Sequence, residues 1–101
     1  MANNKLKDEM TDRLFDAMLL LRDREEYYMF FEDLCTISEI KSMAQRLEVA
    51  SMLQEGRTYE DIMNHTSVST ATIARVKRSL DYGAEGYRLV FSKKDKGRKV
   101  K

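Results

Sequence analysis

Residues 58–80 read TYEDIMNHTSVSTATIARVKRSL, and this stretch decides the fold. Thr58 can cap a helix, because its hydroxyl accepts a hydrogen bond from an amide of the first turn. The polar run 64–67 then interrupts the helical period, Ser69 offers a second cap, and the period resumes over residues 71–80. The stretch therefore predicts two short helices joined by a tight turn.

Four apolar side chains in this stretch have the spacing that a helix-turn-helix requires. Where two short helices cross steeply, the small core between them needs one apolar residue from the first helix, one from the turn and two from the second. These places are taken by Ile62, Val68, Ile73 and Val76. Because a lone apolar residue inside a polar turn is rare in arbitrary amphipathic helices, the pattern predicts a helix-turn-helix over about residues 58–80.

The exposed face of the second helix, expected over residues 69–80, carries side chains suited to the major groove of DNA. Short hydroxyl side chains near its start can reach base edges or thymine methyls, and cations further along can bind phosphate or guanine. The predicted DNA-binding residues are Ser69, Thr70, Thr72, Arg75, Lys77 and Arg78. The alternative for these residues is an ordinary solvated helix face.

The chain before this stretch has few residues that break helices. It contains no proline, and the first of its four glycines is Gly56. Apolar residues recur at helical spacing over residues 6–21, and large apolar and aromatic side chains cluster over residues 27–34. A chain this short can hardly bury both of these apolar surfaces by itself. We therefore interpret the N-terminal half as the shared core of a homodimer. A core within one chain is the alternative.

A third helix is predicted from Thr36 to about Glu55. Thr36 and Glu39 have the spacing of a capping box, and Gly56 suits the helix end because glycine adopts the left-handed conformation without steric cost. The apolar positions of this helix are Ile37, Ile40, Ala44, Leu47 and Met52 or Leu53. A last short helix is expected over residues 84–90, with packing residues Tyr87, Val90 and Phe91. No strand pattern competes, so the expected fold class is all-α, a bundle of about six helices.

Length and charge indicate one domain with a basic end. A chain of 101 residues is one domain by length, and we assign residues 1–92 to it and residues 93–101 to a basic, disordered tail. The net charge is −4 over residues 1–35, zero over 36–92 and +5 over 93–101. A polyanion would therefore meet the C-terminal portion first. The tail either contacts the DNA backbone or only keeps the protein soluble.

Several classes of protein are disfavoured. No apolar run is long enough to cross a bilayer and no secretory signal is present, so we expect a cytoplasmic protein without membrane contact. Cys35 is interpreted as a buried small hydrophobe, and His65 as a turn residue that caps or contacts phosphate. We see no metal-ligand cluster, phosphate loop or nucleophile-base pair, so the sequence predicts no metal site, no catalytic residue and no enzyme.

The order of these elements and several residues resemble the Trp repressor superfamily, in particular the small YerC/YecD-type family of TrpR-related proteins. The similarity is most specific over residues 69–75, Ser-Thr-Ala-Thr-Ile-Ala-Arg, with Leu34, Arg46 and Gly56 in register upstream. The resemblance implies an intertwined helical homodimer that presents two reading helices to a palindromic operator in double-stranded DNA. It also implies a transcriptional regulator that acts as a repressor.

The resemblance further implies a pocket for a small effector. The Trp repressor holds L-tryptophan between the third helix and the reading helix, with the indole clamped by two arginines. The matching residues here are Arg46 and Arg75, with small polar contacts near Thr36 and at Ser79. Val76 replaces the family's glycine after the second arginine, and its branched side chain would crowd the indole. The alternatives are therefore L-tryptophan, another small effector or no effector.

A different class of function stays open at this point. The same fold could serve as a protein-interaction module, in which the acidic N-terminal half and its aromatic cluster bind a protein partner and DNA contact is incidental. The small overall net charge of +1 favours this alternative. Charge reversal at Lys77 and Arg78 separates the two hypotheses, because only a DNA-binding protein should lose its function.

Overall fold

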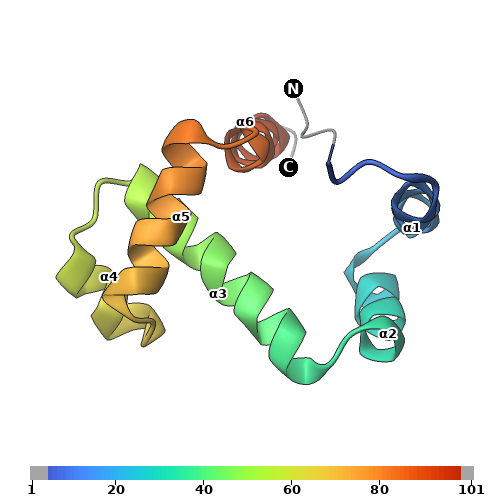
Figure 1. Cartoon of the computed structure of the whole chain (residues 1–101), viewed down its shortest axis with the longest axis horizontal. Coiled ribbons are helices and arrows are strands. Elements are labelled where there is room, and N and C mark those ends of the chain that lie inside the picture. The colour runs from blue at the N-terminus through green and yellow to red at the C-terminus, as the bar shows by residue number, and fades with distance from the viewer. Residues whose placement is uncertain (1–4, 99–101) are drawn as a thin grey trace. The chain divides into compact units, whose positions relative to one another are not determined.

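The computed structural model describes residues 5–98, and within this range it contains six α-helices and no strand (Figure 1). The helices are α1 (Glu9–Leu19), α2 (Arg24–Leu34), α3 (Ile37–Gln54), α4 (Tyr59–Thr66), α5 (Thr70–Tyr82) and α6 (Gly86–Arg98). The predicted all-α bundle is confirmed. The chain divides into two compact units, residues 1–41 and 42–101. Over the described residues, no helix is both long and apolar enough to span a membrane.

Side-chain caps explain where the central helices begin. The Glu39 amide donates to Thr36 Oγ1 at 3.1 Å, and the Thr36 amide donates to Glu39 Oε1 at 2.8 Å. This reciprocal pair is the predicted capping box, and it starts α3. Thr58 and Ser69 are the N-caps of α4 and α5, as the sequence predicts, and their hydroxyls accept from the amides of residues 61 and 72.

The core of the C-terminal unit joins α3, α4, α5 and α6. Its buried side chains are Val49, Ala50, Met52, Ile62, Ile73, Val76, Leu80 and Phe91. Val68 is partly buried and packs against this cluster. The four positions predicted from the turn spacing therefore meet in one core, and Figure 1 shows α4 and α5 beside the C-terminal part of α3. This core fixes the position of α5.

The side of α3 that enters the core differs from the prediction. Ile37 is 75% exposed and Leu47 45% exposed, whereas Val49 and Ala50 are fully buried. Of the predicted positions, Met52 is buried and Leu53 packs against the core. The prediction failed because α3 is long enough to serve two units, and only its C-terminal part meets α4 and α5.

The last helix begins later and extends further than predicted. We expected a helix over residues 84–90, but α6 covers Gly86–Arg98 and so includes most of the segment assigned to a disordered tail. Residues 99–101 lie outside the described part. Tyr87 and Phe91 pack as predicted, with ring centroids 6.3 Å apart, but Val90 is 50% exposed. Residues 87 and 91 share a helix face because they are four apart.

The N-terminal unit leaves its apolar side chains at the surface. No residue of α1 or α2 is buried, and Leu19 and Leu20 are 81% and 80% exposed. The rings of Phe30 and Phe31 pack edge to face at 5.8 Å, yet they do not close a core. Cys35, at the end of α2, is a free thiol that is half-buried rather than fully buried as predicted.

Candidate functional site

The turn between α4 and α5 sets the direction of α5. Ser67 ends α4 in the left-handed conformation, with φ of 64°, and its amide donates to the carbonyl of Met63 at 2.8 Å. The hydroxyl of Thr66 donates to the carbonyl of Ile62 at 2.7 Å, which satisfies another of the last carbonyls of α4. Three residues, 67–69, are enough to reverse the chain and begin α5.

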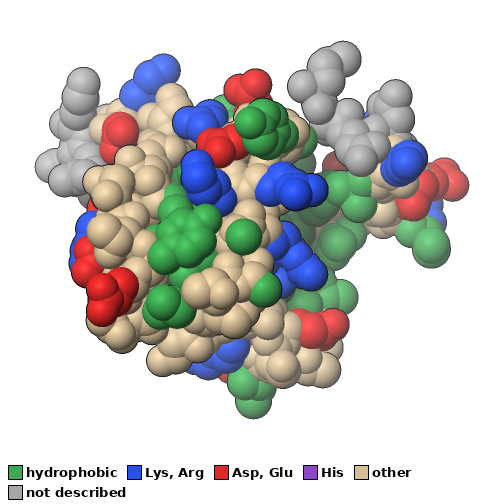
Figure 2. Space-filling view, turned by 60° about the vertical axis from the view of Figure 1, so that its left-hand side comes forward, with side chains coloured by type: hydrophobic (Ala, Val, Ile, Leu, Met, Phe, Trp, Pro, Cys, Tyr) green, Lys and Arg blue, Asp and Glu red, His purple; other side chains and the backbone are tan. Residues whose placement is uncertain are grey.

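The structure places all six predicted DNA-binding residues on α5 or at its cap. Thr70, Arg75, Lys77 and Arg78 are exposed, and so is the cap residue Ser69. Thr72 is only half exposed, and its hydroxyl lies 3.2 Å from that of Ser69. Figure 2, which turns the α4 and α5 side of the molecule forward, shows Lys and Arg side chains close to one another around a hydrophobic patch.

The three cations of α5 differ in their partners. The ammonium of Lys77 donates to Asp81 Oδ2 at 2.9 Å. This hydrogen bond, together with the charge of the carboxylate, raises the pKa of Lys77 above its ordinary value. Arg75 and Arg78 make no ion pair or hydrogen bond with another described residue. Their guanidinium groups are therefore free to bind an external anion.

A cavity of about 300 Å³ lies between α3 and α5, beside the turn. It is lined by Ser42, Gln45, Arg46, Ser67, Val68, Thr72 and Arg75. The two arginines of the predicted effector pocket thus line one cavity. Ser79 does not line it, and Thr36 belongs to the N-terminal unit, where it caps α3. Val76 is 2% exposed in the core and is absent from the lining.

Two polar residues of α3 that line this cavity were not predicted from the sequence. Ser42 precedes Gln45 by three residues and Arg46 by four, and residues at these two spacings share one side of a helix. The signal was present as a short polar stripe on α3. It could not be interpreted from the sequence because nothing showed that this side of α3 meets the turn before α5.

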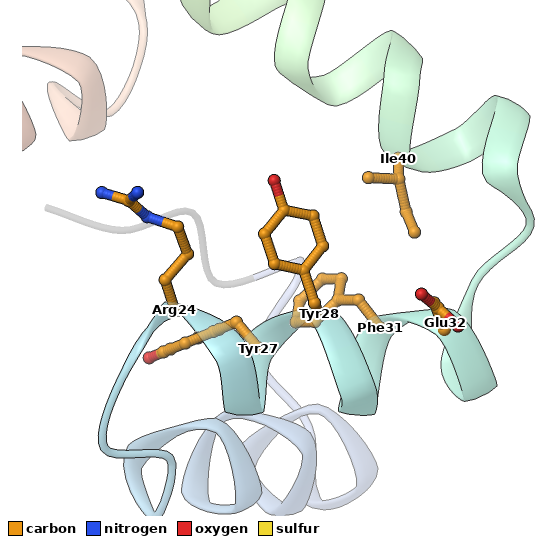
Figure 3. Close-up of a pocket in the computed structure, with 6 residues that line it drawn as sticks. All are labelled: Arg24, Tyr27, Tyr28, Phe31, Glu32 and Ile40. Atoms are coloured by element: carbon orange, nitrogen blue, oxygen red, sulfur yellow. The ribbon is translucent and has the colours of Figure 1, made fainter.

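A second cavity, within the N-terminal unit, is almost wholly apolar. It has a volume of about 300 Å³ and is lined by Arg24, Tyr27, Tyr28, Phe31, Glu32 and Ile40. Figure 3 shows the side chains of Tyr28 and Ile40 projecting into the space between α2 and the first turns of α3. The aromatic cluster was predicted from the sequence, whereas the contribution of Ile40 was not.

Two solved structures share this arrangement of helices. A TrpR-like protein from Eubacterium eligens matches with a TM-score of 0.87 at 58% sequence identity, covering 90% of this chain and 94% of that chain. A protein from Staphylococcus aureus, described as a proposed Trp repressor, matches with a TM-score of 0.88 at 48% identity, covering 94% and 95%. The fold therefore defines a TrpR-like protein.

Sequence comparison identifies the family. The family model for the Trp repressor protein matches residues 9–95. The uncharacterized protein YerC of Bacillus subtilis (strain 168) is 54% identical over 90 residues, which are 89% of this chain and 86% of YerC. This chain belongs to the Trp repressor family, a family of regulators rather than of enzymes. The resemblance predicted from the sequence is confirmed.

Proposed function

We propose that this protein is a sequence-specific DNA-binding repressor of transcription that reads a palindromic operator with α5. The observation that carries the proposal is the pair of unpartnered cations, Arg75 and Arg78, on a helix whose first exposed residue is Thr70. Because DNA is the proposed partner, we place the protein in the cytoplasm. The unit formed by α4, the turn and α5 would act as a helix-turn-helix.

The length of α5 would allow its first residues to contact bases and its later residues to contact phosphates. Thr70 and Arg78 are eight residues apart, which is about 12 Å along a helix axis. The major groove has a width of about 12 Å. If the start of α5 enters the groove, Thr70 reaches base edges while Arg78 reaches phosphates at the rim. Phosphate contacts would then position the helix, and the hydroxyl side chains would supply base readout.

The exposed apolar side chains of the N-terminal unit support a homodimer. In one chain, α1 and α2 bury no residue, and the apolar cavity beside Tyr28 is open to a partner. Exposed apolar surface of this extent marks a protein interface. We propose that a second copy covers it, since a two-fold dimer would present two copies of α5 to the two halves of a palindrome.

The proposed function is tested by selecting bound sequences from random duplex DNA and titrating the most enriched sequence with the protein at two salt concentrations. Enrichment of a palindrome, with affinity that falls steeply as salt rises, is the expected result. Arg78→Glu should abolish binding, whereas Lys41→Glu makes the same charge change in the other unit and should retain it. If no sequence is enriched and both variants behave alike, the protein-interaction module becomes the better hypothesis.

The cavity between α3 and α5 favours a second element of the function, control by a small effector. Two guanidinium groups, from Arg46 and Arg75, line it with mostly polar neighbours, so an anionic group such as a carboxylate could bind there. L-tryptophan is one candidate and another small anionic effector is the alternative. Calorimetric titration of L-tryptophan into the protein and its Arg46→Gln variant, with Arg13→Gln as control, tests this proposal. Absence of binding heat in the unmutated protein would reject L-tryptophan as the ligand, and equal binding heats for all three proteins would reject this cavity as its site.

A further inference from the structure

One carboxylate near the end of α5 binds two cations from different helices. Asp81 Oδ2 accepts from Lys77 Nζ at 2.9 Å, and Asp81 Oδ1 lies 3.6 Å from Nη2 of Arg88 on α6. The Nε of Arg88 also donates to the carbonyl of Leu80 at 3.2 Å, which directs its guanidinium toward the end of α5. The two cations are therefore held around one oxyanion.

This cluster lies on the same side of α5 as the proposed base-reading residue. Thr70, Ala74, Lys77 and Asp81 follow one another at spacings of four, three and four residues, and all are exposed. Such spacings align side chains along one helix face. Lys77 is seven residues from Thr70, or about 10 Å along the helix axis. A DNA duplex bound at Thr70 would bring its phosphates close to Lys77.

Stability alone does not account well for the cluster. The side chains of Lys77 and Arg88 are 51% and 50% exposed, and that of Asp81 is 34% exposed. Ion pairs in such exposed positions contribute little to folding, because water screens them. The positions of the two cations do, however, favour binding of an anion. A phosphate presents oxygens to Lys and Arg much as a carboxylate does, so two cations arranged around Asp81 are also arranged for a phosphate.

We propose that Lys77 and Arg88 form a phosphate-binding pair for the DNA backbone and that Asp81 is its built-in competitor. The inference rests on the proposed DNA-binding function and adds Arg88 and Asp81 to it. In the free protein, Asp81 contacts both cations and offsets one of their two positive charges. A backbone phosphate must displace or share this carboxylate, so binding to DNA of any sequence is weakened. Readout of bases by the start of α5 then accounts for a larger part of the affinity for the operator.

The experiment compares Asp81→Asn with Asp95→Asn in the full chain. Both variants add one unit of positive charge to the C-terminal unit, and Asp95 is exposed and pairs with no described residue. Affinity for a random-sequence duplex is measured across a series of salt concentrations. Each phosphate newly neutralised steepens the slope of log K against log salt by about 0.9. Asp81→Asn should bind about tenfold more tightly at low salt, with a slope steeper by up to about 1.8.

The matched variants distinguish release of Lys77 and Arg88 from Asp81 from a general effect of added positive charge on DNA binding. Asp95→Asn should leave the slope unchanged. Adding Lys77→Met or Arg88→Met to Asp81→Asn should each remove about half of the gain in slope. Equal effects of Asp81→Asn and Asp95→Asn, with unchanged slopes, would overturn the competitor role and leave DNA binding intact. Absence of salt-dependent binding by every variant, the unmutated protein included, would overturn the proposed function itself.

Discussion

The Nε2 atom of His65 lies 3.3 Å from Oε2 of Glu48, so an exposed contact joins α4 to α3. From the sequence we interpreted His65 as a turn residue that caps or contacts phosphate, but it lies in the last turn of α4, beside a carboxylate of α3. Both side chains are more than half exposed, at 59% and 52%. One turn earlier on α4, Ile62 is completely buried in the core. The two contacts should differ greatly in their contribution to stability.

His65→Ala should lower the free energy of unfolding by less than about 1 kcal/mol, because even a charged contact between exposed side chains contributes little. Ile62→Ala should lower it by about 2–5 kcal/mol, because it removes buried methyl groups and leaves a cavity. Urea unfolding followed by circular dichroism measures both. A larger loss for His65→Ala than for Ile62→Ala would contradict the assignment of Ile62 to the core.

Ser67→Gly should stabilise the protein. Ser67 adopts the left-handed conformation, with φ of 64°, in which a side chain is strained and glycine is not. Relief of this strain should raise the free energy of unfolding by about 0.5–1 kcal/mol, net of the greater freedom of glycine in the unfolded chain. Ser67→Val should have the opposite effect, since β-branched residues tolerate this conformation poorly. Equal melting temperatures for the two variants would contradict the prediction that the backbone of Ser67 is strained.

Two glycines near the start of α6 should respond in opposite ways to alanine. A Cβ added at Gly83 would lie 2.4 Å from the backbone carbonyl oxygen of Ser79, so Gly83→Ala must displace the end of α5. At Gly86, the first residue of α6, a Cβ meets no atom within 4 Å. Gly86→Ala should therefore stabilise the helix by about 0.5–1 kcal/mol, and Gly83→Ala should destabilise the protein. Thermal unfolding of both variants tests the pair, and destabilisation by Gly86→Ala would be the contrary result.

These examples show which parts of the structure the sequence could predict. The caps at Thr36, Thr58 and Ser69 were predictable because a cap depends on residues within one helical turn. The core positions Ile62 and Val76 were predictable because the turn is short and permits few arrangements. Features that depend on distant packing were not, which explains the errors at α6 and on the core side of α3.

The same distinction applies to the candidate site. Arg75 and Arg78 could be placed on the exposed face of α5 from helical periodicity alone. The cavity residues Ser42 and Gln45 could not be found, because they become neighbours of α5 only when α3 packs against it. The pairing of Arg88 with Asp81 depends in the same way on how α6 meets α5.

The capping box of α3 predicts a dependence of stability on pH. The hydrogen bond from the Thr36 amide lowers the pKa of Glu39 below its ordinary value of 4.5. Because the pKa of Glu39 is lower in the folded protein than in the unfolded chain, its ionised carboxylate contributes fully to stability above about pH 4.5. This contribution is lost as the pH falls through the pKa of Glu39 in the folded protein. Glu39→Gln keeps an acceptor but cannot ionise. The melting temperatures of the two proteins should therefore differ at pH 7 and converge in acid, and parallel curves would contradict the prediction.

Thr70 and Thr72 should have different roles although both belong to the predicted reading surface. Thr70 is exposed and forms no side-chain hydrogen bond with a described residue, so its hydroxyl and methyl are available to a base. The hydroxyl of Thr72 contacts Ser69, and the residue lines the cavity beside Arg46. Thr70→Ala should therefore relax the preference at one operator position by about 1–3 kcal/mol. Thr72→Ala should change base preference less and alter ligand binding in the cavity more. Affinities for operators with single base changes test the first expectation, and an unchanged preference in Thr70→Ala would show that the reading surface lies elsewhere on α5.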